Sequence, residues 1–254
     1  MFNFELFQSN LKTQILGKKN FYYASTSSTN DDIWRIFNKE KKEGVIVVAN
    51  EQLKGRGRGN KKWHSCKNKS LICSFLIKQK FPNSKLGFHS LIVPIGIIAG
   101  IDKTVNKTLS IKWPNDIIYE NKKIGGVLIE SKILQKTTYL NIGFGINVNE
   151  NEMDYIPNIK NNANSLKKIV GEEIQREILL ANILNAIDKL LIKKNEKKII
   201  EYWISLCSHI DKKINVIYKK NIIETIFKTI NNNGQAILHY KNNDITFDGP
   251  ILNI

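Results

Sequence analysis

Two apolar segments of this chain, residues 122–130 and 139–147, have the composition of β-strands but carry glycines inside them. The first contains Gly125-Gly126 and the second contains Gly143-Phe144-Gly145. Glycine weakens a strand because it has no side chain to pack, so an interior glycine indicates a bulge or the close approach of another group. Two such segments, joined by a short polar connection, predict either a bulge in the sheet or a ligand that lies directly against its backbone.

A glycine-rich basic loop follows a third strand-like segment, residues 45–49. It contains Gly55-Arg56-Gly57-Arg58 and continues to Trp63. Glycine lets the backbone approach a ligand, arginine presents a planar fork of donors to phosphate or carboxylate, and the indole offers a flat face. The pattern predicts a loop that closes over an anion. The alternative for the loop taken alone is a solvated basic surface or a nonspecific nucleic-acid contact.

A second polar constellation lies between two strand-like runs within residues 109–119. Lys112, Asn115 and Asp116 surround Pro114, which fixes its own φ and favours an extended conformation for the residue before it. Lys112 is therefore expected to end one strand, while Asn115 and Asp116 begin the returning strand. An ordinary Pro-Asn-Asp turn without a ligand is the alternative for this segment alone.

Together and in this order, these motifs resemble the biotin–protein ligases, also called holocarboxylase synthetases. The resemblance covers about residues 25–149, and the C-terminal remainder fits by length and β-rich character. It is carried by Ser28-Thr29-Asn30, Gln52, Gly55-Arg56-Gly57-Arg58, Lys112-Trp113-Pro114-Asn115-Asp116, Lys123-Ile124-Gly125-Gly126 with Ile129-Glu130, and Gly143-Phe144-Gly145-Ile146-Asn147.

The resemblance implies an ATP-dependent enzyme that activates biotin as biotinyl-5′-AMP, with Mg²⁺, and transfers it to a lysine of a biotin carboxyl carrier domain. Its catalytic cations would be Lys112, Arg58 and Lys123, and Asp116 would engage Mg²⁺. The implied biotin-binding residues are Ser28, Thr29, Asn30, Gln52, Arg56, Gly57, Arg58, Lys112, Gly125 and Gly126. The implied nucleotide-binding residues are Arg58, Trp63, Asn115, Asp116, Lys123 and Asn147.

The residues themselves are compatible with this chemistry. A site that joins biotin's carboxylate to ATP must neutralise several negative charges, whereas the neutral ureido ring of biotin requires matched donors and acceptors. Ser28-Thr29-Asn30 also fits a helix N-cap, because Ile33, Ile36 and Phe37 follow at helical spacing. Transfer to an amine needs no nucleophile from this chain. The three cysteines and four histidines form no redox or metal-ligand spacing, and we interpret the histidines as structural or solvated.

The fold class predicted is α+β. A mixed sheet built from residues 45–50, 71–77, 109–119, 123–134 and 138–147 is expected to carry helices near 29–41, 86–105 and 173–205 on one face, like class II synthetases, and to leave the other face as the ligand platform. Short strands after residue 208 predict an SH3-like barrel, as in the family. The expected domains are 1–207, catalytic, and 208–254, a small β domain.

The 27 residues before Ser28 are too few for a DNA-binding domain, so we expect a monofunctional ligase.

The 39 basic and 23 acidic residues give a net charge of +16, which makes nucleic acid or an acidic partner worth considering. The charge is mostly lysine scattered along the chain, as on a solvated surface, and steering of an acidic carrier domain is the other interpretation. The longest apolar run is too short to cross a bilayer, and no signal-type segment begins the chain, so a cytoplasmic monomer or homodimer without membrane or DNA binding is expected.

One stretch departs from the family pattern. Many members carry a further arginine or glycine after the Gly-Arg-Gly-Arg run, where this chain has Gly59-Asn60-Lys61-Lys62. A lysine does not replace the arginine fork, which bears on how firmly the closed loop retains the adenylate.

Two rival functions stay open. A lipoate–protein ligase shares the fold and the acyl-adenylate chemistry but lacks these motifs in this form, and a noncatalytic RNA-binding module would use the cations and tryptophans on phosphates and bases.

Overall fold

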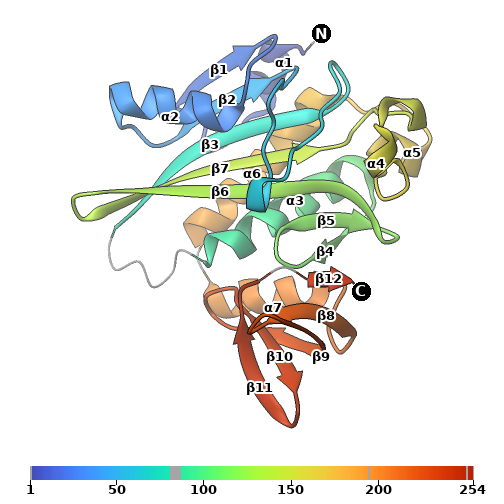
Figure 1. Ribbon diagram of the computed structural model, residues 1–254. Coiled ribbons are helices and arrows are strands. Elements are labelled where there is room, and N and C mark those ends of the chain that lie inside the picture. Colours follow the sequence, from blue (N-terminus) through green and yellow to red (C-terminus); the bar gives the residue numbers. More distant parts are fainter. Residues whose placement is uncertain (1, 81–86, 194, 250, 254) are drawn as a thin grey trace.

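The computed structural model describes residues 2–80, 87–193, 195–249 and 251–253 and contains two β-sheets with helices packed around them (Figure 1). The first sheet consists of β1 (Lys19–Tyr23), β2 (Val45–Ala49), β3 (Leu71–Lys80), β4 (Ser110–Lys112), β5 (Asp116–Tyr119), β6 (Lys122–Leu134) and β7 (Thr137–Ile146). Its strand order is β1-β2-β3-β7-β6-β5-β4. β1 and β2 pair in parallel and the remaining neighbours pair antiparallel, which confirms a mixed sheet.

The segment predicted over 109–119 is a hairpin, β4–β5, that turns at residues 113–115. The helices are α1 (Phe4–Asn10), α2 (Thr29–Glu40), α3 (His89–Val105), α4 (Pro157–Lys160), α5 (Leu166–Val170), α6 (Arg176–Lys193) and α7 (Glu196–Leu206), with 3-10 turns η1 (Arg58–Asn60) and η3 (Glu152–Asp154). Helix α1 and strand β1 were not among the predicted elements.

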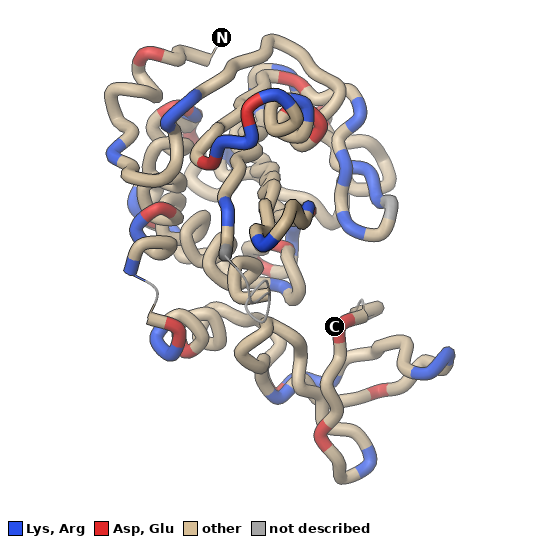
Figure 2. The backbone as a smooth tube through the Cα atoms, turned by 90° about the vertical axis from the view of Figure 1, so that its left-hand side faces the viewer, with Lys and Arg blue, Asp and Glu red and all other residues tan. Residues whose placement is uncertain are grey.

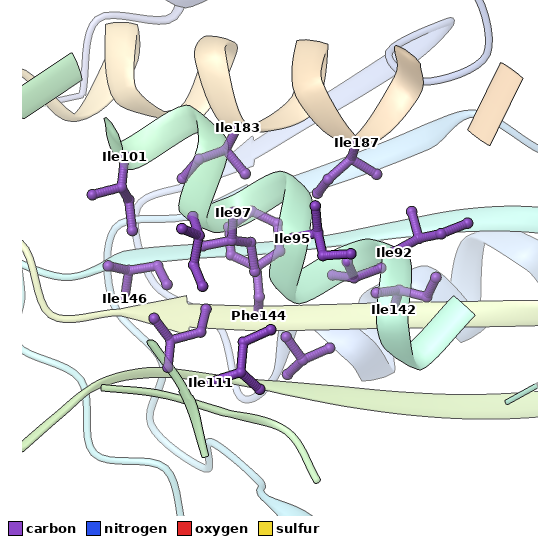
Figure 3. Packing of buried hydrophobic residues seen from close by; sticks show 14 of the residues in the cluster. Ile92, Ile95, Ile97, Ile101, Ile111, Ile142, Phe144, Ile146, Ile183 and Ile187 are labelled. Carbon is purple, nitrogen blue, oxygen red and sulfur yellow. The ribbon is translucent and has the colours of Figure 1, made fainter. Parts of the chain in front are cut away.

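Helices α3 and α6 form the layer behind the sheet, with α3 between the sheet and α6 (Figure 3). Two glycines of α3 allow the helices to approach closely. A Cβ on Gly96 would lie 2.4 Å from Ile187 Cγ1, and a Cβ on Gly100 would lie 2.5 Å from Ile183 Cα. Buried isoleucines from α3, α6 and the sheet fill the interface, so this layer is a rigid support for the opposite face.

Helix α2 packs on that opposite face, so the prediction that all helices cover one face was wrong. The physical reason is that β2 is apolar on both sides. Ile46 and Val48 join the core shared with α3, whereas Val45 and Val47 pack with Ile33 of α2 in a second cluster. A strand buried on both faces lacks the alternation that would assign its sides. The loop between β2 and β3 crosses the remainder of this face (Figure 1).

The helix predicted over 173–205 is two helices. Helix α6 ends at Lys193, and α7 starts after Asn195, whose side chain accepts a hydrogen bond of 3.2 Å from the backbone N–H of Lys198. An asparagine N-cap favours a new helix start, and the stripe of apolar residues continued across it. The helix predicted from residue 86 begins at His89, and residue 86 itself lies outside the described residues.

The second sheet contains β8 (Lys213–Tyr218), β9 (Asn221–Ile230), β10 (Ala236–Tyr240), β11 (Asn243–Phe247) and β12 (Ile251–Asn253). Its order is β11-β10-β9-β8-β12, with antiparallel neighbours. The strands were predicted except β12, but the barrel was not confirmed. β11 and β12 are the two edges of an open sheet, because the described strands include no pairing between them.

Lysines and arginines are spread over both sheets and most helices rather than gathered on one element (Figure 2). This distribution fits a solvated basic surface. Among the described helices, none has both the length and the apolar character that crossing a membrane requires.

A buried carboxyl group lies just past β7. Glu150 is 1% exposed, accepts a hydrogen bond from the Ser70 hydroxyl at Oε1, and has no described donor at Oε2. Burial raises the pKa of Glu150 from 4.5 to about 7, with a smaller contribution from Asp154. Ionising this group inside the protein is therefore unfavourable compared with ionising it in the unfolded chain.

We predict that Glu150→Gln flattens part of the pH dependence of stability. Between pH 4.5 and about 7 the folded state binds the proton that the unfolded state has lost, so the free energy of unfolding falls as pH rises through this window and is level above it. The shift in the pKa of Glu150 corresponds to a loss of about 3 kcal/mol in the free energy of unfolding across this window. Urea denaturation of both proteins at about pH 5 and pH 8 measures it. Equal losses of stability in the two proteins would contradict the prediction.

Candidate functional site

The open face of the first sheet carries a cavity of about 800 Å³. Its walls come from the start of α2, the loop after β2, the β4–β5 turn, and strands β6 and β7. Segments far apart in sequence therefore converge on one site. Most of the residues predicted for ligand binding line it, namely Ser28, Thr29, Asn30, Gln52, Arg56, Gly57, Arg58, Trp63, Lys112, Asn115, Asp116, Lys123 and Gly126.

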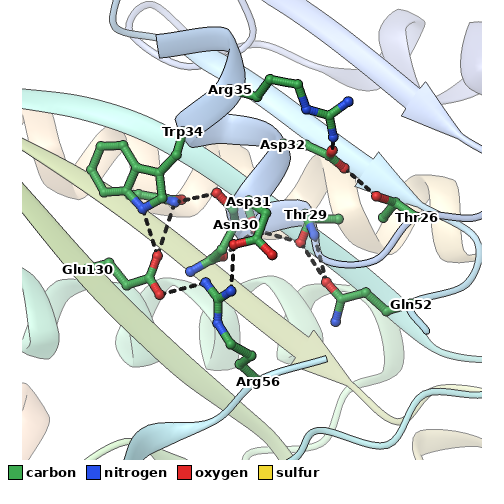
Figure 4. Close-up of polar contacts among 12 residues, drawn as sticks. Thr26, Thr29, Asn30, Asp31, Asp32, Trp34, Arg35, Gln52, Arg56 and Glu130 are labelled. Carbon is green, nitrogen blue, oxygen red and sulfur yellow. Dashed lines mark hydrogen bonds and ion pairs between the residues drawn. The ribbon is translucent and has the colours of Figure 1, made fainter. Parts of the chain in front are cut away.

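A chain of polar side chains closes one end of the cavity. Gln52 Oε1 accepts hydrogen bonds from the backbone N–H of Thr29, at 2.8 Å, and from its hydroxyl, at 3.0 Å (Figure 4). The Thr29 hydroxyl also lies 2.6 Å from that of Ser74, which donates to Asn30 Oδ1 at 2.6 Å. The buried Asn30 Nδ2 has no partner among the described residues, so this wall has a donor to offer a ligand.

The glycines of β7 make room for side chains of the protein. A Cβ on Gly143 would lie 2.1 Å from Asn30 Oδ1, and a Cβ on Gly145 would lie 2.4 Å from Cε2 of the Trp63 ring. The sequence predicted a ligand against these strands, and at Gly143 and Gly145 the groups in that place are Asn30 and Trp63 of the protein itself. The pairing of β6 with β5 has an irregularity between Ile117 and Ile118, next to the glycines of β6.

The basic loop is fastened at Arg56. Its guanidinium pairs with Asp31 and with Glu130 Oε1, the latter at 2.8 Å, and Glu130 Oε2 accepts a hydrogen bond of 2.8 Å from Trp34 Nε1 (Figure 4). Arg58, two residues later, is exposed at the start of η1. In the part of the chain that the structure describes, Arg58 has no ion-pair partner. One arginine thus anchors the loop and the other faces the cavity unneutralised.

The opposite wall carries the lysines. Lys123 Nζ lies 2.6 Å from Asp116 Oδ1 and 5.7 Å from the centre of a Trp63 ring, so it is held between a carboxylate and an aromatic face. Lys112 ends β4 opposite Asp116. Over the described ranges Lys112 forms no ion pair, so its charge is available to an anion.

Asn115 fixes the β4–β5 turn to strand β6. Its side-chain amide donates to the Val127 carbonyl at 2.6 Å, and its own carbonyl accepts from the Val127 N–H at 3.0 Å. The peptide bond between Trp113 and Pro114 is cis. The two hydrogen bonds to Val127 fix the turn to β6, with Lys112 and Asp116 on either side of it.

Two predicted residues do not line this cavity. Gly125 is buried, and a Cβ there would lie 2.4 Å from Ile146 Cδ1, so it serves the packing of β6 on β7. Asn147 lines an adjoining cavity of about 1080 Å³, which the basic loop also lines, and its amide donates to the Asn164 carbonyl at 3.0 Å.

The sequence analysis missed other residues of the site. Ser74 is fully buried at the centre of the polar chain, and its signal was a single hydroxyl inside the apolar run of β3. Asp31 and Glu130, which hold Arg56, were not assigned that role. Ile251 and Leu252 of β12 also line the cavity, and no local pattern indicates that the second sheet reaches it.

Comparisons with known proteins agree with this geometry. Residues 22–147 match the model of the biotin/lipoate A/B protein ligase family. The chain is 33% identical over 180 residues to the bifunctional ligase/repressor BirA of Bacillus subtilis, covering 70% of this chain and 55% of that protein. It is 30% identical over 207 residues to the human biotin–protein ligase, covering 77% of this chain and 28% of that protein. The chain therefore spans about half the length of the first relative and less of the second.

A solved structure shows the same architecture. The biotin protein ligase from Aquifex aeolicus, in complex with biotin and ATP, superposes with a TM-score of 0.77 and is 25% identical, covering 93% of this chain and 98% of that one. The matched family segment contains β2, β3, β6 and the loop, turn and helix start that surround the cavity. By this match and by its fold, the chain belongs to the biotin/lipoate A/B protein ligase family.

Proposed function

We propose that this protein joins biotin to ATP, forming biotinyl-5′-adenylate, and then transfers biotin to a lysine of a biotin carboxyl carrier domain. The observation that carries this proposal is the composition of the cavity of about 800 Å³. A neutral hydrogen-bonding wall around Gln52 and Asn30 lies at one end, and the cations Arg58, Lys112 and Lys123 lie around the other parts. This combination suits a ligand that is polar and uncharged at one end and anionic at the other.

The neutral wall is matched to a ureido ring. A buried ring of this kind needs donors for its carbonyl oxygen and acceptors for its N–H groups. The unpaired Nδ2 of Asn30 offers a donor, and the hydroxyl of Ser28 offers both functions. Because Thr29, Ser74 and Gln52 already bond to one another, the wall is preorganised before a ligand binds.

The cations supply what the first reaction requires. A carboxylate oxygen of biotin attacks the α-phosphorus of ATP, a new P–O bond forms, and the bond to the pyrophosphate leaving group breaks. Both reactants are anionic, so positive charge near the reacting atoms lowers the barrier and holds them in line. Lys112 and Arg58 face the cavity without counter-ions among the described residues, and this availability supports roles for them at the carboxylate and phosphates.

The second reaction uses the activated acyl group. The lysine amine of the acceptor attacks the acyl carbon, AMP departs with the electron pair of the broken C–O bond, and the amine loses a proton. No nucleophile of this chain is needed. Burial raises the pKa of the half-buried Cys66 thiol to about 11, which keeps that side chain protonated near neutral pH.

Magnesium would enter with the triphosphate. Asp116 is the candidate ligand, and its Oδ1 already pairs with Lys123. A single aspartate suits Mg²⁺, which commonly uses one or two carboxylates and takes phosphates and waters as its other ligands. Bound there, the ion would neutralise phosphate charge.

Biotin is preferred to lipoate as the substrate. The family description includes both acids, but the relatives from human and Aquifex aeolicus are named as biotin–protein ligases, and the latter was solved with biotin and ATP. The carrier domain as acceptor is implied by the resemblance and stays a prediction. A monomer or homodimer, cytoplasmic location and absence of DNA binding stay predictions.

The purified protein, incubated with Mg²⁺-ATP and biotin, is expected to form biotinyl-adenylate that mass spectrometry detects. Addition of a carrier domain should then consume the adenylate and add biotin to one lysine. Parallel incubation with lipoate is the control. Lipoyl-adenylate in place of the biotin product would assign the sister activity, and the absence of both adenylates would contradict the proposal.

Substituting Arg58 is expected to loosen retention of the adenylate. In Arg58→Ala the intermediate should leave about tenfold to a hundredfold faster, because a hydrogen bond to a charged group contributes about 1.5–3 kcal/mol. The released adenylate should label lysines of a bystander protein, which a streptavidin blot measures. Lys54→Ala, on the same loop, is the matched control. Unchanged retention in Arg58→Ala would rule out a closing role for this residue.

A further inference from the structure

One buried histidine is bonded to the backbone of the β4–β5 turn. His209 lies after α7, is 0% exposed, and its Nε2 accepts a hydrogen bond of 3.0 Å from the backbone N–H of Trp113. Trp113 is the residue directly after Lys112. The bond therefore links the segment that leads into the second sheet with the residue next to the free lysine of the cavity.

The bond defines the state of the imidazole. Because Nε2 accepts from an N–H group, the proton of the neutral ring is on Nδ1, which lies 3.3 Å from the Ser208 hydroxyl. Burial, with the charges of Lys112 and Lys212, lowers the pKa of His209 to about 4. The ring is thus neutral near pH 7 and remains an acceptor there.

A second backbone bond flanks Lys112 on its other side. The Ser208 N–H donates to the Ile111 carbonyl at 2.9 Å. The residue before Lys112 is therefore held by Ser208, and the residue after it is held by His209. The Trp113 N–H lies in a buried residue. Without His209 this donor would lose its acceptor, and a buried unpaired donor is costly enough to move the turn.

The indole of Trp113 adds a fixed point beyond the turn. Its Nε1 donates to the Gly234 carbonyl at 3.0 Å, and its ring lies against Phe227 and Phe247 of the second sheet. The side chain is therefore held by one set of contacts and the backbone by another. Loss of the His209 bond would release the backbone next to Lys112 while the indole stays anchored.

We propose that His209 is a positioning residue for Lys112. It acts through the Trp113 N–H and does not touch the cavity, and its role in the reaction rests on the proposed biotin activation. Positioning affects the rate of the chemical step more than the binding of biotin, because the polar wall around Gln52 is built from other elements.

Kinetics of biotinyl-adenylate formation test this proposal. His209→Leu should lower kcat by about tenfold to a hundredfold, as expected for a displaced reacting group, with little change in KM for biotin. His209→Gln, which places an amide oxygen near the Nε2 position, should restore most of kcat. The asparagine of His209→Asn is too short to reach Trp113, so this variant should resemble His209→Leu. If His209→Leu does not fold, His209→Asn takes its place in the test. His239→Leu, at a partly exposed histidine of β10, is the matched control.

Hydrogen exchange of the Trp113 amide gives a readout that does not depend on activity. Exchange should be faster in His209→Leu and return toward wild type in His209→Gln. Normal kcat in His209→Leu, or slow exchange in it, would overturn the proposal, as would failure of His209→Gln to restore either quantity in a folded protein. A wild-type protein that makes no adenylate refutes the proposed function, and the exchange data then still decide whether His209 holds the turn.

Discussion

The site depends on the absence of side chains at two positions of β7. With Gly143 and Gly145 the open face of the sheet is flat enough for Asn30 and the Trp63 ring to lie directly on the backbone, at positions where any Cβ would collide with them. The start of α2 and the end of the basic loop are brought to the same strand in this way. The rigid layer of α3 and α6 behind the sheet keeps this surface in place.

Charge is arranged around this surface in two ways. Arg56 and Lys123 are neutralised by carboxylates of the protein, so they fix the loop and the wall, whereas Arg58 and Lys112 have no such partners among the described residues. Paired charges hold a structure, and unpaired charges in a concave site attract anions. This division explains how the protein's own carboxylates hold together a cavity rich in cations that still favours anionic reactants.

The sequence predicted the parts of the site that are local in the chain. The basic loop, the Lys112–Asp116 hairpin and the Ser28-Thr29-Asn30 helix start each contain their own conformational signals, and the structure brings all three to one cavity. Ser74 and the edge strand β12 were missed because their roles arise from contacts distant in sequence. Closure of the second sheet was wrongly predicted for a related reason, since strand propensity does not state which strand pairs with which.

The most direct test is a crystal structure of the protein with biotin and a non-hydrolysable ATP analogue. The account predicts both ligands in the cavity of about 800 Å³, with the ureido ring hydrogen-bonded at the wall formed by Thr29, Asn30 and Gln52, and with the carboxylate and α-phosphate beside Lys112. Biotin bound in the reverse orientation, or outside this cavity, would contradict it.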